Sequence, residues 1–330
     1  MLALCAGVVS AQDRRAAESP EQRAVAYLAA EVASWQPQNH CFSCHNNGDG
    51  ARALYRASKH SFRVPAQSLT ETTRWLSAPQ GWTKGLSESP AGDPKLARLQ
   101  FAAALAEALD AGAVTDRRIL NEACSRIAAD QQPDGSWHGG ESGLGSPATY
   151  GKCLATYLAR RTLEKSGDTR FAPAIGKADR WLVSAPARSN LDAAAVSMAM
   201  EGRSGAEPAA KRRKCVEALL QGQSSDGGWG PYPQTPSEAF DTAITVLALA
   251  GAADLTDVAR ALSRGRAHLL EIQLEAGGWA GTTRPSGSNS YAQHISTTAW
   301  AILALLETVR PQDRAATNES TTSRARNRLQ

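Results

Sequence analysis

The sequence predicts an all-α protein in which six helical hairpins close into a single α/α toroid. Apolar residues recur with the 3.6-residue period of amphipathic helices along most of the 330-residue chain, and strand signals are nearly absent. In addition, a short pattern containing Gln, Gly and Trp recurs at long intervals. A repeated helical unit buries its apolar face only against its neighbours, so such copies form a stacked or closed array.

The repeated pattern occupies Gln131–Trp137, Gln223–Trp229 and Gln273–Trp279. Its spacing fits a unit of about 46 residues, with one copy lacking the motif near Trp181. The Asp-Gly or Gly-Gly step suits a tight turn, the Gln amide can bond free groups at a helix end, and the Trp ring is suited to packing. We therefore interpret these motif residues as structural: Gln131, Asp134, Trp137, Gln223, Asp226, Trp229, Gln273 and Trp279.

Each hairpin is expected to pair an outer helix, which carries Arg, Lys and Glu, with an inner helix rich in Ala and Leu. The longer links within pairs emerge on one face, which becomes the loop-rich face. The expected pairs are 22–35 with 49–60, 68–78 with 95–111, 116–131 with 146–166, 170–185 with 190–202, 207–222 with 238–251, and 255–272 with 295–309.

These motifs resemble the repeat of the terpenoid cyclases and protein prenyltransferases, especially that of the squalene-hopene cyclases. The resemblance covers about residues 22–310. It implies the α/α toroid, with each Gln at the end of an outer helix and each Trp over the start of the next helix.

The family's catalytic residues are not preserved. Glu238-Ala239-Phe240-Asp241 stands where the resemblance implies an Asp-x-Asp-Asp motif, and Phe240 takes the place of the proton donor. Asp241 matches a prenyltransferase zinc ligand, but Ala243 replaces the partner Cys. Asp241 and Glu238 remain the catalytic candidates, and the alternative is that Asp241 is a carboxylate at a helix N-terminus.

A second motif, Cys41-Phe42-Ser43-Cys44-His45, falls in the first loop of the expected toroid. Cys-x-x-Cys-His is typical of c-type haem attachment, in which both thiols bond the porphyrin and the His ligates the iron. The alternatives are a Cys41–Cys44 disulfide or dithiol, or half of a metal site. If haem binds, His45 is the proximal ligand, and His294 is the candidate second ligand because ring closure brings it beside the first pair.

The termini and the charge limit the class of protein. Residues 1–11 suit an export signal with a truncated start, the toroid takes 20–310, and residues 311–330 suit a disordered polar tail. No stretch is apolar enough to span a membrane. The net charge of +4 is too small and too scattered to indicate nucleic-acid binding.

These observations predict an exported, periplasmic or secreted protein that binds haem c for redox, electron-transfer or ligand-sensing work, with a redox partner. One alternative is a toroid without haem that binds a terpenoid, lipid or other small apolar ligand in its cavity, or retains cyclase-like activity. Another is a scaffold that binds a protein partner.

Overall fold

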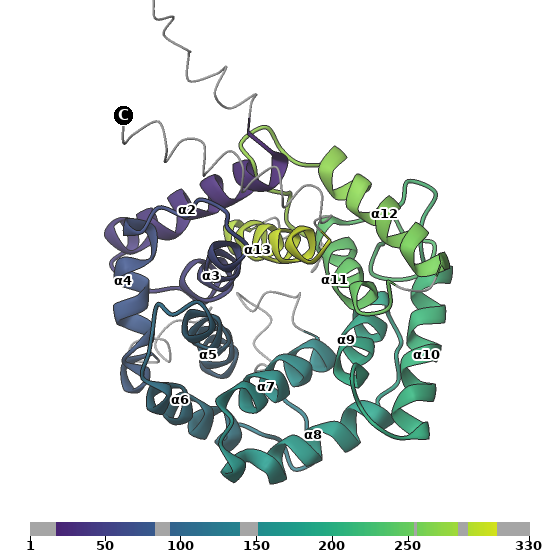
Figure 1. Cartoon of the computed structure of the whole chain (residues 1–330), viewed down its shortest axis with the longest axis horizontal. Coiled ribbons are helices and arrows are strands. Elements are labelled where there is room, and N and C mark those ends of the chain that lie inside the picture. Colours follow the sequence, from purple (N-terminus) through teal and green to yellow (C-terminus); the bar gives the residue numbers. More distant parts are fainter. Residues whose placement is uncertain (1–17, 83–92, 139–150, 254–255, 283–289, 309–330) are drawn as a thin grey trace, which may run out of the picture.

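The computed structural model describes residues 18–82, 93–138, 151–253, 256–282 and 290–308, and these form two concentric rings of helices (Figure 1). The described residues contain no strand. The outer ring consists of α2 (Pro20–Asn39), α4 (Gln67–Leu76), α6 (Arg117–Ala129), α8 (Ala172–Ser184), α10 (Ala206–Gln221) and α12 (Thr256–Glu271). The inner ring consists of η1 (Cys44–Gly50) with α3 (Ala51–Lys59), α5 (Pro94–Asp110), α7 (Lys152–Ser166), α9 (Asn190–Met200), α11 (Ala239–Ala250) and α13 (Tyr291–Glu307).

Burial separates the two rings as the composition predicts. The inner helix α13 is buried almost continuously from Gln293 to Leu306. Along the outer helix α8, Ala178 and Leu182 are the buried residues. A helix that is apolar all round must lie inside, whereas one with a single apolar stripe covers the core from outside. The predicted assignment of inner and outer helices is confirmed.

Each motif joins three helices through hydrogen bonds. The Gln131 side-chain nitrogen donates at 2.9 Å both to Gly135 O in its own turn and to Ala174 O in the next outer helix, α8. The Trp137 ring nitrogen donates back to Ile127 O in α6 at 2.8 Å, and its backbone nitrogen donates to Thr156 Oγ1 in α7 at 2.9 Å. We call this arrangement the brace; it repeats at Gln223–Trp229 and at Gln273–Trp279.

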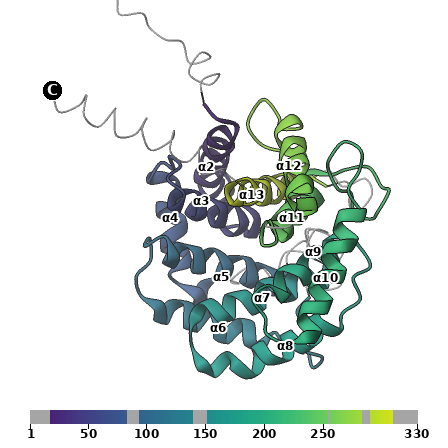
Figure 2. The ribbon, with the colours of Figure 1, turned by 45° about the vertical axis from the view of Figure 1, so that its right-hand side comes forward.

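The third brace closes the ring. Gln273 bonds Pro20 O in α2 at 2.9 Å, and Arg23 in turn donates to Gln273 Oε1 at 3.0 Å. Gly277 has φ of +107°, and a Cβ there would lie 2.7 Å from Arg23 O, so glycine is required. Both views show α13 beside the first pair of helices (Figure 1, Figure 2), and the predicted closure is confirmed.

The structure also corrects several details. The first inner helix begins at Cys44, as the π-helical turn η1, because the Ser43 hydroxyl caps it by accepting from Asn46 N. Hence the Cys-x-x-Cys-His motif straddles a loop and a helix start, and does not lie wholly in a loop. The outer helix α2 runs to Asn39, past its predicted end at 35.

One further buried Trp was not predicted. Trp82 follows the short helix η2 (Pro79–Gly81) and donates its ring hydrogen bond to Trp75 O at 3.0 Å. Gln80-Gly81-Trp82 is a shortened form of the motif, and that shortened form is the signal the sequence offered. The expected export signal at 1–11 and polar tail at 311–330 fall outside the described residues. Among the helices that are described, none is both long enough and apolar enough to cross a bilayer.

Candidate functional site

The Cys-x-x-Cys-His segment is held at its base by buried amides. Asn47 accepts from Ser43 N at 2.9 Å and donates to Thr72 Oγ1 in α4 at 2.8 Å. Asn46 donates to Tyr291 Oη in α13 at 2.8 Å, which links the segment to the last helix of the ring. These bonds fix the backbone on which Cys44 and the neighbouring imidazole are carried.

The two thiols of the segment are free. Cys41 is exposed and Cys44 is partly buried, and neither forms a disulfide in the structure. Burial, with a smaller effect of Asp49, raises the pKa of the Cys44 thiol to about 12, so at neutral pH it is a thiol and not a thiolate. The three other described cysteines, Cys124, Cys153 and Cys215, are buried.

His45 is enclosed by two aromatic rings. The Trp35 ring lies 4.8 Å from it and the Tyr291 ring 5.7 Å, both nearly perpendicular to the imidazole. Its Nε2 atom is buried and has no hydrogen-bond partner. Burial lowers the pKa of His45 to about 4, so the imidazole is neutral at physiological pH. A neutral imidazole with an unused nitrogen is the form that ligates metals.

His294 lies on the same face as His45, as ring closure predicts. Its ring nitrogen is hydrogen-bonded to Tyr27 in α2. Its Nε2 is 2.9 Å from Tyr27 Oη, and the ring that packs against His45 belongs to Tyr291, one turn earlier on α13. The predicted pairing of His45 with His294 on one iron stays a prediction. No group of three or more His, Cys, Asp or Glu in the described part of the chain is arranged to hold a metal ion.

The stretch that corresponds to the cyclase acid begins α11. Phe240 is fully buried and meets the Trp300 ring edge-on at 6.3 Å. Asp241 is 1% exposed in the first turn of the helix, which is the position of a carboxylate that stabilises a helix N-terminus. Glu238 precedes the helix as its N-cap residue, and its backbone nitrogen donates to Trp229 O at 3.0 Å. The backbone bond from Glu238 to Trp229 O ties the start of α11 to the second brace.

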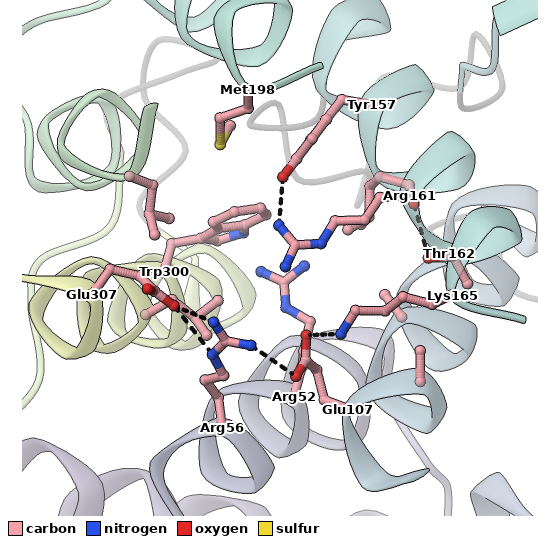
Figure 3. Close-up of a pocket in the computed structure, with 15 residues that line it drawn as sticks. Arg52, Arg56, Glu107, Tyr157, Arg161, Thr162, Lys165, Met198, Trp300 and Glu307 are labelled. Atoms are coloured by element: carbon pink, nitrogen blue, oxygen red, sulfur yellow. Dashed lines mark hydrogen bonds and ion pairs between the residues drawn. The ribbon is translucent and has the colours of Figure 1, made fainter. Parts of the chain in front are cut away.

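A cavity of about 70 Å³ lies at the other end of the inner helices. Its outer part contains ion pairs: Lys165 donates to Glu107 at 2.7 Å, and Arg56 pairs with Glu107 and Glu307 (Figure 3). These four residues stand in the last turns of α3, α5, α7 and α13. The opening of the cavity is therefore charged and internally paired.

The deeper part of the cavity was not predicted. The residues that line it are Arg52, Arg161, Tyr157, Met198 and Trp300 (Figure 3). Arg161 donates to Tyr157 Oη at 2.7 Å, and the Arg52 guanidinium lies 4.0 Å from the centre of the Trp300 ring. The sequence did carry a signal, because these two Arg interrupt inner helices that are otherwise rich in Ala and Leu.

Comparison with known proteins places the fold in a class. No protein-family model and no curated protein matches the chain. The fold and the repeated brace define the α/α toroid of the terpenoid cyclases, and solved structures agree. One similar structure is the type II terpene cyclase MstE from Scytonema, an Arg-to-Ala variant in complex with its substrate geranylgeranyl dihydroxybenzoate. The superposition covers 87% of this chain and 98% of that chain, with a TM-score of 0.54 and 14% sequence identity.

A second MstE variant, in complex with its product merosterolic acid A, gives a TM-score of 0.57 at 14% identity, over 87% of this chain and 96% of that one. The ent-copalyl diphosphate synthase from Streptomyces platensis gives 0.52 at 19% identity, over 79% of this chain and 50% of that one. At these identities the likeness shows the fold alone. The chain is a terpene-cyclase-like toroid in architecture.

Proposed function

We propose that this protein is a cyclase-like toroid that does not cyclise terpenes and instead carries a covalently attached c-type haem on its loop-rich face. The observation that carries the proposal is the grouping, within five residues, of two free thiols and an imidazole whose buried Nε2 has no partner. Because c-type haem is attached outside the cytoplasm, the proposal includes export of the chain. The work we assign to it is one-electron transfer or ligand sensing.

Two observations argue against cyclisation. A buried Phe240 stands where the proton donor is expected, so no acid is available at that position. The central cavity has a volume of about 70 Å³, whereas pockets for drug-sized ligands have about 300–1,000 Å³. In the described part of the chain, a cyclase-like fold with Phe240 at the acid position and a central cavity of this size is better suited to carrying a group on its surface.

The residues present fit a c-type haem in chemistry and in order. Cys41 is exposed for thioether formation, Cys44 follows at the required spacing, and His45 offers a neutral nitrogen. Bound haem supplies a redox-active iron. The rings of Trp35 and Tyr291 cover the His45 nitrogen, so ligation requires these two side chains to shift.

The surrounding residues hold the imidazole. Tyr291 donates to Glu31 in α2 at 2.6 Å and accepts from Asn46 in η1. Its hydroxyl is therefore held by two different elements. On the same junction His294 is bonded to Tyr27. Release of that bond frees an imidazole nitrogen on the loop-rich face, which is why His294 remains our proposal for a second ligand.

The test is to produce the full chain in a host that matures c-type cytochromes and to examine it by absorption spectroscopy and by haem staining of a denaturing gel. We expect a stained band for the wild type and none for Cys41→Ala or Cys44→Ala, with helical circular dichroism retained. Cys124→Ala is the matched control, because that thiol is buried elsewhere, and it should stain like the wild type. A wild-type protein that never stains would contradict the proposal.

A second candidate is a toroid that binds a small molecule in the central cavity without haem. The charged, half-enclosed cavity favours it. Its volume disfavours the terpenoid or lipid form of this hypothesis, because a C20 chain exceeds it several-fold. Native mass spectrometry of the purified full chain tests this candidate, with a ligand of defined mass expected if it is correct.

A further inference from the structure

The central cavity contains a buried guanidinium group of which two nitrogens have no hydrogen-bond acceptor among the described residues. Arg52 is 4% exposed, and its Nε and Nη2 atoms are buried and unbonded. The guanidinium carbon lies 4.0 Å from the centre of the Trp300 ring, which is a favourable contact. This contact does not supply an acceptor for the Nε and Nη2 hydrogens. Burying a cation without a counter-charge costs several kcal/mol. Arg52 therefore offers two strong hydrogen-bond donors to a ligand, because no described group of the protein accepts from them.

Arg161 adds a second guanidinium beside the first. Both side chains point towards the middle of the cavity (Figure 3), and Arg161 bonds Tyr157. In the part of the chain that the structure describes, neither Arg52 nor Arg161 forms an ion pair with a carboxylate, although Glu107 and Glu307 line the same cavity. Two like charges that face one space repel each other, and an anion between them offsets that repulsion.

The charges of the lining do not balance. Four basic side chains, Arg52, Arg56, Arg161 and Lys165, face two carboxylates, Glu107 and Glu307, and Lys165 also pairs with Asp110 beside the lining, which leaves a surplus of one positive charge. Arg56 and Lys165 already pair with both carboxylates. The surplus is thus carried by the deeper pair, Arg52 and Arg161.

A purely structural role explains only part of this pattern. Basic residues in the last turn of a helix stabilise its C-terminus, and this accounts for Arg56 and Lys165. It does not account for Arg52, the second residue of α3, nor for Arg161, which precedes the last turn of α7. The deeper guanidinium groups need a different reason to be buried.

We propose that this cavity binds a phosphate group, either free phosphate or the phosphate of a small phosphomonoester. A phosphate carries about −1.5 to −2 charge at neutral pH, which suits two guanidinium groups, Arg52 and Arg161, that pair with no carboxylate among the described residues. The planar donor fork of an Arg side chain suits its oxygens, and the Tyr157 hydroxyl stands beside the Arg161 fork. The volume of about 70 Å³ accepts a headgroup but not an isoprenoid chain. The site is independent of the haem proposal, because its opening lies at the C-terminal ends of the inner helices, whereas His45 lies at the start of the first one.

The test uses the full chain in phosphate-free buffer, titrated with sodium phosphate or with glycerol 3-phosphate. Calorimetry gives the affinity and thermal unfolding gives the change in Tm, while sodium chloride at equal ionic strength corrects for screening. We expect saturable binding and a rise in Tm of a few degrees. Binding of free phosphate assigns the ion itself, and binding of the ester alone assigns a phosphorylated small molecule.

Two variants locate the site. Arg52→Met should weaken binding at least tenfold, because a hydrogen bond to a charged group contributes about 1.5–3 kcal/mol. It should also unfold at the same or a higher temperature without phosphate, because an unpaired buried charge has been removed. Arg74→Met is the control, since Arg74 is 70% exposed and pairs locally with Glu71, and it should bind like the wild type.

Arg52→Lys keeps the charge but loses the fork, so it should fold and bind more weakly; it replaces Arg52→Met if that variant does not fold. The proposal is overturned if neither phosphate compound binds saturably. It is also overturned if the Arg52 variant that folds binds as tightly as the wild type.

Discussion

The braced joints of the ring and the joint that carries His45 are built from opposite chemistry. At Gln131, Gln223 and Gln273 the side-chain amide donates both to its own turn and to the next outer helix, and each brace as a whole joins three helices. In the first pair, Asn46 also links the inner helix to Glu31 O in α2, but the neighbouring imidazole lies between two rings with its Nε2 unbonded among the described residues. Repeated, satisfied polar groups serve the fold, whereas the candidate for function is the joint that departs from the repeat.

The largest expected effect is on a braced joint. Trp229 is fully buried and its ring nitrogen donates to Leu219 O in α10, so Trp229→Ala removes a large ring and that bond, while the backbone bond to Thr242 remains. We expect the free energy of unfolding to fall by about 3–5 kcal/mol, measured by urea denaturation. Tyr232→Ala, at an exposed position in the same loop, should have little effect. Equal losses in the two variants would remove the distinction between brace and loop.

The brace that closes the ring should behave differently from the same brace inside it. Gln273→Leu loses three hydrogen bonds: it leaves the carbonyls of Pro20 and Gly277 with one donor fewer and Arg23 with one acceptor fewer, which should lower the free energy of unfolding by about 2–3 kcal/mol. Gln223→Leu is the matched control. Hydrogen exchange should accelerate in α2 only in the Gln273 variant. If α2 exchanges alike in both variants, the third brace does not hold the ring closed.

At the His45 joint the sign of the effect should reverse. In haem-free protein, His45→Leu removes an unbonded buried nitrogen and keeps the volume, so the free energy of unfolding should rise by about 1–2 kcal/mol. The exposed His40, substituted by Asn, serves as control because Asn tolerates its left-handed φ of 56°. Chemical denaturation at pH 7 measures both. A loss of stability in His45→Leu would mean that the imidazole is held as firmly as a brace residue.

The pH dependence checks the same joint. His45 has a pKa of about 4 when folded and about 6.5 when unfolded, so the unfolded chain binds the proton more readily. The free energy of unfolding of the haem-free wild type should therefore decrease as the pH falls from about 6.5 towards 4. The decrease should be smaller in His45→Leu. Parallel pH profiles for the two proteins would show that folding does not shift the pKa of His45.

The sequence could predict the fold because periodicity and motif act locally. Apolar spacing identified each helix, and Gln-Gly-Trp copies identified the joints, down to closure at Gln273. It could not predict the cavity, because the meeting of Arg52 with Arg161 depends on how α3 and α7 are placed across the ring. The motif Cys41–His45 could be found in the sequence, but the rings around His45 come from α2 and α13, which meet only after closure.

The smallest expected effect concerns the Asp of the motif, and it separates turn chemistry from surface charge. Lys152 pairs with Asp134 at 2.8 Å, but both side chains are close to half exposed, so Lys152→Met should change the free energy of unfolding by less than about 1 kcal/mol. Asp134→Ala also loses the bonds from Ser136 N and Ser136 Oγ, which hold the turn before Trp137. It should therefore cost more than the Lys152 change, by roughly 1 kcal/mol in urea denaturation. If the two variants lose the same stability, Asp134 acts only as the counter-charge of Lys152, and the turn is held by Gly135 and Gln131 alone.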